Sequence, residues 1–213
     1  MARLVPVELP IRPTPLPAAV RRLLDDADDR VERFAQDHRD RPVPAFVPCD
    51  FVAAHHALAA VQSLSLAAGG RFAEWGSGVG TVTCLASLSG FDAVGIEIEP
   101  DLVEVAEALA DDHAIEVEFV RGSFVPEGGD DVLDEHAYDL DREVTWLRTD
   151  LGSGGDAYDQ LGLDPDDFDV VFAYPWPGEE AVVFDLFAEF AAVGALLLTH
   201  HGEDGMRLQR KVR

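Results

Sequence analysis

Three glycines at alternate positions stand between a short apolar run and a helical pattern. Residues 71–75 read as a strand, and Gly76, Gly78 and Gly80 follow it directly. Because glycine has no Cβ, such a turn bends sharply and lets a ligand approach the backbone N–H groups closely. The helix expected from residue 81 presents its unpaired N–H groups and positive dipole end to the same ligand. The spacing therefore predicts a ligand-binding turn at the head of a sheet.

Two carboxylates stand near this turn. Glu74 comes two residues before the first glycine, and Glu97 ends the next apolar run, nineteen residues after Gly78. A carboxylate at the end of the neighbouring strand can accept two hydrogen bonds from a ribose diol. A dinucleotide fingerprint, G-x-G-x-x-G, needs its third glycine at position 81, where this chain has Thr81. The alternative interpretation is a tight turn without a ligand, flanked by solvent-exposed acids.

The G-x-G-x-G turn with its preceding acid resembles motif I of the class I (Rossmann-like) S-adenosylmethionine-dependent methyltransferases. Residues 95–100 (GIEIEP) are similar to the acidic post-I segment of that family, and residues 119–124 (FVRGSF) to its third-strand motif. Residues 168–177 (FDVVFAYPWP) are similar to its fourth-strand motif, which faces the methyl group. The resemblance covers roughly residues 45–200, and it implies S-adenosyl-L-methionine as the cofactor and methyl transfer as the activity.

The resemblance also implies roles for single residues. Glu74 is expected near the amino group of the cofactor, and Glu97 at its ribose hydroxyls. Ser123 and Phe124 are expected beside the adenine, with Ser123 in the place of a more usual acid. The residues implied to bind the cofactor are, in chain order, Glu74, Gly76, Ser77, Gly78, Gly80, Glu97, Ser123 and Phe124.

Methyl transfer needs an aligned acceptor and, where the acceptor has one to lose, the removal of a proton. Amino- and amide-directed relatives end the fourth strand in Asn/Asp-Pro-Pro-aromatic, whereas residues 174–177 read Tyr-Pro-Trp-Pro. This departure argues against nucleobase or glutamine N-methylation. Tyr174 is expected to hydrogen-bond the acceptor and Trp176 to pack against a flat or cationic one, the alternative being an aromatic pair that closes the sheet. His200 is a candidate general base.

Short apolar runs alternate with helical patterns over the rest of the chain. The strands expected are 71–75, 93–97, 115–120, 168–173 and 195–199, and the helices expected between them are 81–88, 100–113 and 179–191. Such alternation predicts right-handed βαβ units. The fold class expected is α/β: Rossmann-like and doubly wound, with a mostly parallel sheet of five to seven strands and N-terminal helices. The short C-terminal tail, with one expected strand at 206–212, favours a sheet of five or six strands.

Residues 1–50 are expected to form an N-terminal arm and helix, and residues 51–213 the S-adenosylmethionine-binding methyltransferase domain. The five prolines in the first seventeen residues favour an extended arm without regular structure. Asp50 is expected to cap a second helix that runs to Gly69. The segment 46–51 resembles one that covers the cofactor in many of these enzymes; simple packing is the alternative.

The segment 125–167 interrupts the alternation, with fourteen acids and two bases. It is interpreted as a solvated, partly mobile surface insertion. The alternative is a lid or a partner-binding flap, because long insertions in compact domains are often functional. A short strand is expected at 145–147 and a helical turn at 158–161.

The composition limits the partners. The chain has 213 residues and a formal net charge of −25, which makes nucleic acid an unlikely partner. No apolar stretch approaches the ~18 residues of a membrane span, and the N-terminus does not read as a signal peptide. Two cysteines do not make a disulfide framework or a cysteine-based metal site, and the adjacent His200 and His201 would point to opposite faces of an extended chain, so no metal is expected. A soluble, cytoplasmic protein is expected, with no oligomeric state assigned.

The function expected is S-adenosylmethionine-dependent methyl transfer to an unidentified acceptor, either a protein amino group or a small molecule. One alternative is a cofactor-binding module that has lost catalysis and serves as a partner or regulatory subunit. The altered tetrad at 174–177 motivates that alternative. A nicotinamide-dependent oxidoreductase is disfavoured by Thr81.

Overall fold

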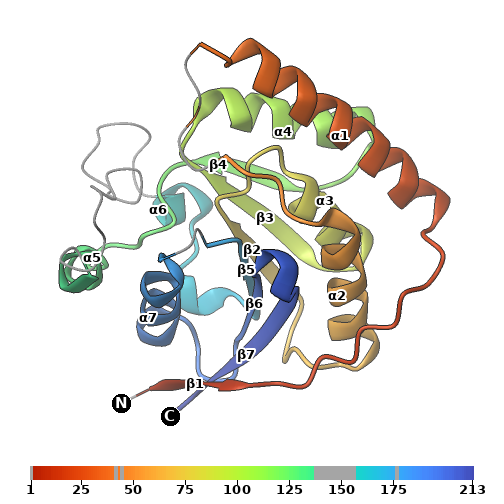
Figure 1. The fold of residues 1–213 in the computed structure, drawn as a ribbon. Coiled ribbons are helices and arrows are strands. Elements are labelled where there is room, and N and C mark those ends of the chain that lie inside the picture. The colour runs from red at the N-terminus through yellow and green to blue at the C-terminus, as the bar shows by residue number, and fades with distance from the viewer. Residues whose placement is uncertain (1, 41–42, 44–45, 137–156, 176–177) are drawn as a thin grey trace.

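A single seven-stranded sheet organises the chain. The computed structural model describes residues 2–40, 43, 46–136, 157–175 and 178–213. Its strands are β1 (Arg3–Pro6), β2 (Arg71–Trp75), β3 (Asp92–Glu97), β4 (Glu118–Arg121), β5 (Val170–Ala173), β6 (Leu196–His200) and β7 (Met206–Val212). They lie in the order β1-β7-β6-β5-β2-β3-β4, and the five from β4 to β6 are parallel (Figure 1). The strand order reverses between β2 and β5, which is where open α/β sheets bind ligands.

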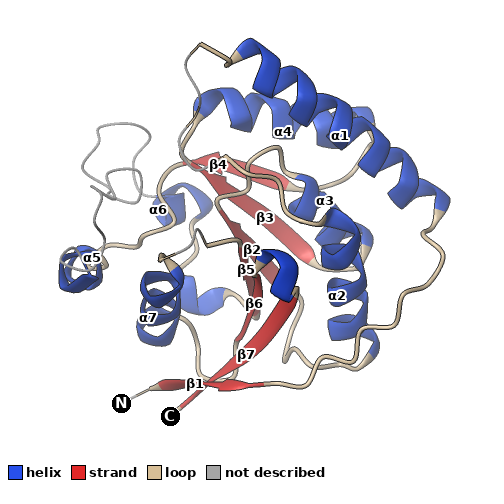
Figure 2. Cartoon of the chain, viewed as in Figure 1, coloured by secondary structure: helices blue, strands red, loops and turns tan. Residues whose placement is uncertain are grey.

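Helices cover both faces of the sheet (Figure 2). The helices are α1 (Ala18–Asp37), α2 (Phe51–Ser63), α3 (Thr81–Leu88), α4 (Pro100–Asp112), α5 (Asp130–His136), α6 (Ala157–Leu161) and α7 (Glu180–Phe190), with short 3₁₀ turns at Pro165–Asp167 and Gly202–Asp204. Core residues of α1 to α4 pack on one face with Phe72, and those of α5 to α7 pack on the other with Trp75. Burial on both faces explains the apolar strands, and the expected α/β fold is confirmed. Within the described residues, no helix is both long and apolar enough to cross a bilayer.

The N-terminal segment supplies the edge strand of the sheet. β1 runs antiparallel to β7, which itself runs antiparallel to β6, with Arg3 opposite Val212 and Pro6 opposite Gln209. The expectations of an arm without regular structure and of a sheet of five or six strands are therefore wrong. An edge strand tolerates proline because one of its sides has no ladder partner, and here Pro6 is the last residue of the strand.

Local signals set the ends of two helices. The Asp50 side chain accepts a hydrogen bond of 2.9 Å from the N–H of Ala53, so the expected N-cap of α2 is confirmed. The helix stops at Ser63, before the expected end at Gly69, and the chain turns through Ser65, whose φ is +50°. Pro100 opens α4, where its missing N–H costs nothing.

The described ends of the acidic segment pack on the sheet. Val125, Leu133 and Tyr158 are buried in the apolar cluster beneath α7, and the Tyr158 hydroxyl donates a hydrogen bond of 2.9 Å to the carbonyl of Phe124. For these ends the interpretation as a solvated insertion is wrong, because their apolar side chains complete the covering of one sheet face. The strand expected at 145–147 lies outside the described residues.

Candidate functional site

The glycine turn joins β2 to α3 at the carboxyl edge of the sheet. Gly76, Gly78 and Gly80 have φ values of +74°, +53° and +76°, a region that other residues rarely adopt. The N–H groups of Gly76 and Ser77 both donate to the carbonyl of Ile96 at 2.9 Å, which fastens the turn to β3. The turn therefore keeps its bend without any help from a ligand.

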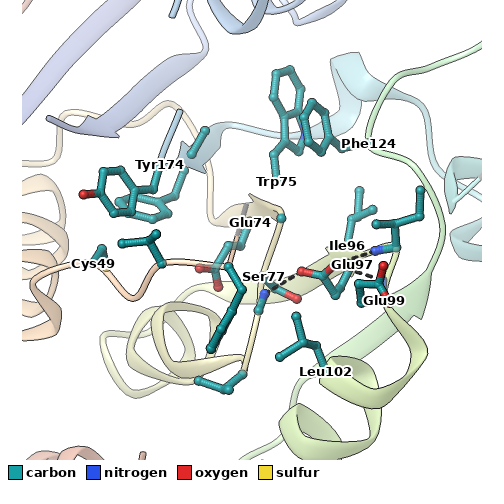
Figure 3. A pocket seen from close by; sticks show the side chains of 18 of the residues that line it. Cys49, Glu74, Trp75, Ser77, Ile96, Glu97, Glu99, Leu102, Phe124 and Tyr174 are labelled. Atoms are coloured by element: carbon teal, nitrogen blue, oxygen red, sulfur yellow. Dashed lines mark hydrogen bonds between the residues drawn. The ribbon is translucent and has the colours of Figure 1, made fainter. Parts of the chain in front are cut away.

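A pocket opens above this turn, as Figure 3 shows. Its walls come from the glycine turn, from the carboxyl ends of β3, β4 and β5, and from residues at and before the start of α2, namely Val43, Phe46, Val47, Pro48, Cys49 and Phe51. In this view Tyr174 and Cys49 lie at one end, and Glu97 and Glu99 lie at the other, with Glu74 between them. Most of the residues predicted to bind a cofactor are thus brought to one place.

Glu97 is the best fixed carboxylate in the pocket. One carboxylate oxygen accepts a hydrogen bond from the N–H of Gly78 (2.8 Å), and the other accepts from the N–H groups of Ile98 (2.8 Å) and Glu99 (3.0 Å). Burial raises its pKa, against the lowering effect of these three donors. Because two carboxylate oxygens offer about four acceptor sites, the group keeps capacity for further donors.

Glu74 is buried beside the turn and also lines the pocket. One of its oxygens accepts two hydrogen bonds from Thr83 in α3, from the N–H at 2.7 Å and from the hydroxyl at 2.6 Å. Burial raises its pKa to about 8, with the Glu97 charge adding to the rise and the Thr83 hydrogen bonds opposing it. With this pKa, Glu74 is mostly the neutral acid at pH 7.

An aromatic wall lies at the β4 side of the pocket. The ring of Phe124 stacks on that of Trp75, with centroids 5.3 Å apart and planes 5° from parallel. Ser123 is buried next to it, and its hydroxyl oxygen accepts a hydrogen bond from the N–H of Val125. Both predicted residues, Ser123 and Phe124, line the pocket. Sequence reasoning missed Trp75, which the motif comparison treats only as the residue before the glycines.

Of the three residues predicted to act on the acceptor, Tyr174, Trp176 and His200, one lines the pocket. Tyr174 lines the pocket, whereas His200 is buried behind it and meets the Tyr174 ring edge-on at 4.5 Å. Burial lowers the pKa of His200, and its Nδ1 has no hydrogen-bond partner within the described part of the chain. Trp176 lies outside the described residues.

Gly80 has a packing role in this structure. It is absent from the pocket wall, and a Cβ built on it would lie 2.5 Å from the Phe119 ring and 2.7 Å from the Cβ of Ala106. The structure thus gives this glycine close helix–sheet packing, and its contact with a cofactor stays a prediction. Gly76, Ser77 and Gly78 do line the pocket.

The segment before α2 forms part of the pocket wall. Phe46 lies over the glycine turn, 3.5 Å from where a Cβ of Gly78 would stand, and its ring packs edge-on against Phe34 of α1. Cys49 lines the pocket near Glu74, and burial raises the pKa of its thiol well above its usual range. This position fits the covering role that the sequence suggested for the segment. Two further wall residues, Val43 and Leu102, could not be identified from the sequence, because it marks them only as apolar.

The charge of the pocket is one-sided. Its described wall contains four glutamates, Glu74, Glu97, Glu99 and Glu179, and none of its described residues is a lysine, an arginine or a histidine. The charged side chains that a ligand meets in this described wall are therefore all carboxylates. Such a wall stabilises positive charge and disfavours an added anion.

Comparisons with known proteins give likeness at the level of fold. No family model matches the chain, and no curated protein does. Among solved structures, an RNA methyltransferase from Salinibacter ruber in complex with S-adenosyl-L-homocysteine is 18% identical, with a TM-score of 0.47 over 79% of this chain and 91% of that one. An O-methyltransferase from Bacillus cereus is 14% identical (TM-score 0.48; 87% of this chain, 66% of that one).

A third similar structure is a SAM-dependent methyltransferase from Thiobacillus denitrificans, also with S-adenosyl-L-homocysteine. It is 21% identical, with a TM-score of 0.43 over 78% of this chain and 53% of that one. At these identities the likeness concerns the fold alone, and the chemistry of the site has to come from the chain's own residues. The strand order and the two helical layers give the chain the Rossmann-like α/β fold of class I S-adenosylmethionine-dependent methyltransferases, as the sequence motifs predicted.

Proposed function

We propose that the chain is an S-adenosylmethionine-dependent methyltransferase. The observation that carries the proposal is the position of Glu97, which is fixed across the glycine turn by the N–H of Gly78 and faces an open pocket. A carboxylate held in this way is prepared to accept a hydroxyl group of a ribose, because the oxygen that accepts from Gly78 has only that one donor.

The charge of the pocket favours S-adenosylmethionine over a nicotinamide dinucleotide. A dinucleotide brings a doubly charged pyrophosphate, which here would lie among four glutamates without a cationic side chain in the described wall. S-adenosylmethionine carries a sulfonium and an ammonium against one carboxylate, so its net charge matches the wall.

The remaining walls suit the parts of this cofactor. The stacked pair Trp75 and Phe124 offers a flat apolar surface for the adenine, with Ser123 beside it. The amino-acid part fits over Gly76 and Ser77, next to Glu74. This orientation directs the methyl group toward Tyr174 at the opposite end from Glu97.

For the acceptor we propose a protein amino group or a small molecule. Tyr174 lies at the end of the pocket where the methyl group would lie, so an acceptor there meets a phenol, and Glu179 is a further carboxyl group in the pocket wall. His200 is held neutral by burial and touches the Tyr174 ring, which suits a base acting through that phenol. Trp176 stays a candidate on sequence grounds.

Calorimetry with S-adenosylhomocysteine and with NAD tests the cofactor. We expect saturable binding of the former and none of the latter; the reverse result would contradict the proposal. Incubation of an extract of the source cells with the protein and radiolabelled S-adenosylmethionine tests the activity, with label expected in protein or small molecules. Binding without any incorporation would favour the alternative of an inactive cofactor-binding module.

A further inference from the structure

Glu74 is a buried acid that has no counter-charge among the described residues. The alternation of β2 puts its side chain on the same face as Phe72, toward α2 and α3, and it is only 5% exposed. Thr83 supplies both of its hydrogen bonds, and neither donor carries a charge. Its carboxyl group nevertheless lines the pocket, so an arriving ligand can reach it.

The ionisable groups that the structure describes around Glu74 supply no unpaired positive charge. Glu97 approaches from β3 and carries the same sign. Cys84 from α3 and Cys49 from the segment before α2 are thiols whose pKa values burial raises, the former to about 12, so both are neutral at pH 7. Arg30 of α1 acts on Cys84, but its guanidinium is already paired with Asp26 and Asp112. Asp50, next to Cys49, is another acid.

We propose that Glu74 loses its proton to solvent when the α-ammonium group of the cofactor binds, so that the pocket exchanges a proton for a cation. The inference rests on the proposed function. The ammonium group supplies the charge that the fold omits, and the resulting ion pair, formed away from water, keeps the carboxylate ionised. No covalent bond changes; one proton leaves the Glu74 carboxyl group for the buffer.

Proton exchange makes Glu74 a determinant of ligand specificity. A ligand with the amino-acid part of the cofactor gains an ion pair only after the carboxyl group ionises, so its affinity rises with pH while that group is still protonated. A ligand with the same nucleoside but without the amino group brings no positive charge next to Glu74, so its binding does not favour ionisation of that carboxyl group. 5′-Methylthioadenosine is such a ligand, because it keeps the adenine, the ribose and the sulfur.

The number of protons released on binding is measured by titration calorimetry in buffers of different ionisation enthalpy. With Glu74 at a pKa of about 8 and a ligand amine near its usual ~7.8, S-adenosylhomocysteine should release roughly 0.9 proton at pH 6.5, and its affinity should rise roughly eightfold from pH 6 to pH 7. 5′-Methylthioadenosine should bind wild type with almost no release. Its titration also reports any contribution from Glu97, which both ligands contact through the ribose.

The variant Glu74→Gln keeps the size of the side chain and an acceptor for Thr83. It should bind S-adenosylhomocysteine without proton release and with little change of affinity between pH 6 and pH 7. The proposal is overturned if wild type binds with no buffer-dependent heat, if the variant releases the same number of protons, or if 5′-methylthioadenosine releases as many. If S-adenosylhomocysteine does not bind to wild type at all, the proposed function fails and this inference fails with it.

Discussion

Replacing Glu74 by glutamine should stabilise the free protein at neutral and alkaline pH. The pKa of this carboxyl group is about 8 in the fold, against 4.5 in its ordinary state. An acid whose pKa is raised by folding binds more protons in the folded state, so it favours folding at low pH. That stability is fully present below pH 4.5 and is lost as the pH rises to about 8.

The expected magnitude follows from the same two pKa values. Linkage gives a loss of about 2–3 kcal/mol in the free energy of unfolding of wild type between pH 5 and pH 7, and about 5 kcal/mol over the whole range, from Glu74 alone. Glutamine cannot ionise, so the variant lacks this loss. Titrations of groups distant from Glu74 are common to both proteins and cancel in the difference, whereas that of Glu97 cancels only in part because its charge interacts with that of Glu74.

Denaturant unfolding of both proteins between pH 5 and pH 8.5, followed by circular dichroism, gives this difference directly. The curves of wild type and Glu74→Gln should diverge with rising pH, with the variant the more stable. Parallel curves would refute the reasoning, because they would mean that Glu74 is ionised in the folded protein. Glu104→Gln on the exposed side of α4 is the matched control and should follow wild type at every pH.

Three further substitutions test separate parts of the site. Gly80→Ala should cost about 1–3 kcal/mol more than Gly162→Ala in thermal unfolding, because both glycines have positive φ but only the first has no room for a Cβ; equal costs would contradict the packing role. Glu97→Ala should weaken binding of S-adenosylhomocysteine by roughly 10- to 100-fold while the protein stays folded, and unchanged affinity would remove it from the ribose site. Tyr174→Phe should slow methyl transfer more than it weakens cofactor binding, and unchanged turnover would reduce Tyr174 to a wall residue.

The parallel core of the fold was predictable because its signals are local. Each buried strand is a short apolar run, and each crossover helix has an apolar stripe, so periodicity alone places β2, β3, β5 and β6 within a few residues. The strand β4 begins three residues later than expected, at Glu118. Its exposed, charged ends leave little apolar pattern to mark where pairing starts.

The edge strand β1 could not be predicted from its own residues. Four residues beside several prolines show no strand pattern, and they become a strand only because β7 offers an unpaired edge in three dimensions. The same limit applies to Gly80, whose role depends on Phe119, a residue 39 positions away in sequence. Contacts between distant segments decide both cases, and periodicity carries no information about them.

The charge of the pocket was likewise predictable only in part, because the motifs mark single acids but not which residues surround them in the fold. The motifs singled out Glu74 and Glu97 as separate candidates, and the net charge of the chain said nothing about either position. The sequence also contains sixteen arginines and lysines, any of which could have neutralised the site. The fold brings none of them into the described wall of the pocket. Two buried acids, Glu74 and Glu97, therefore share one pocket whose described wall has no cationic side chain. Under the proposed function, the positive charge of the ligand, together with the glycine turn, selects the cofactor.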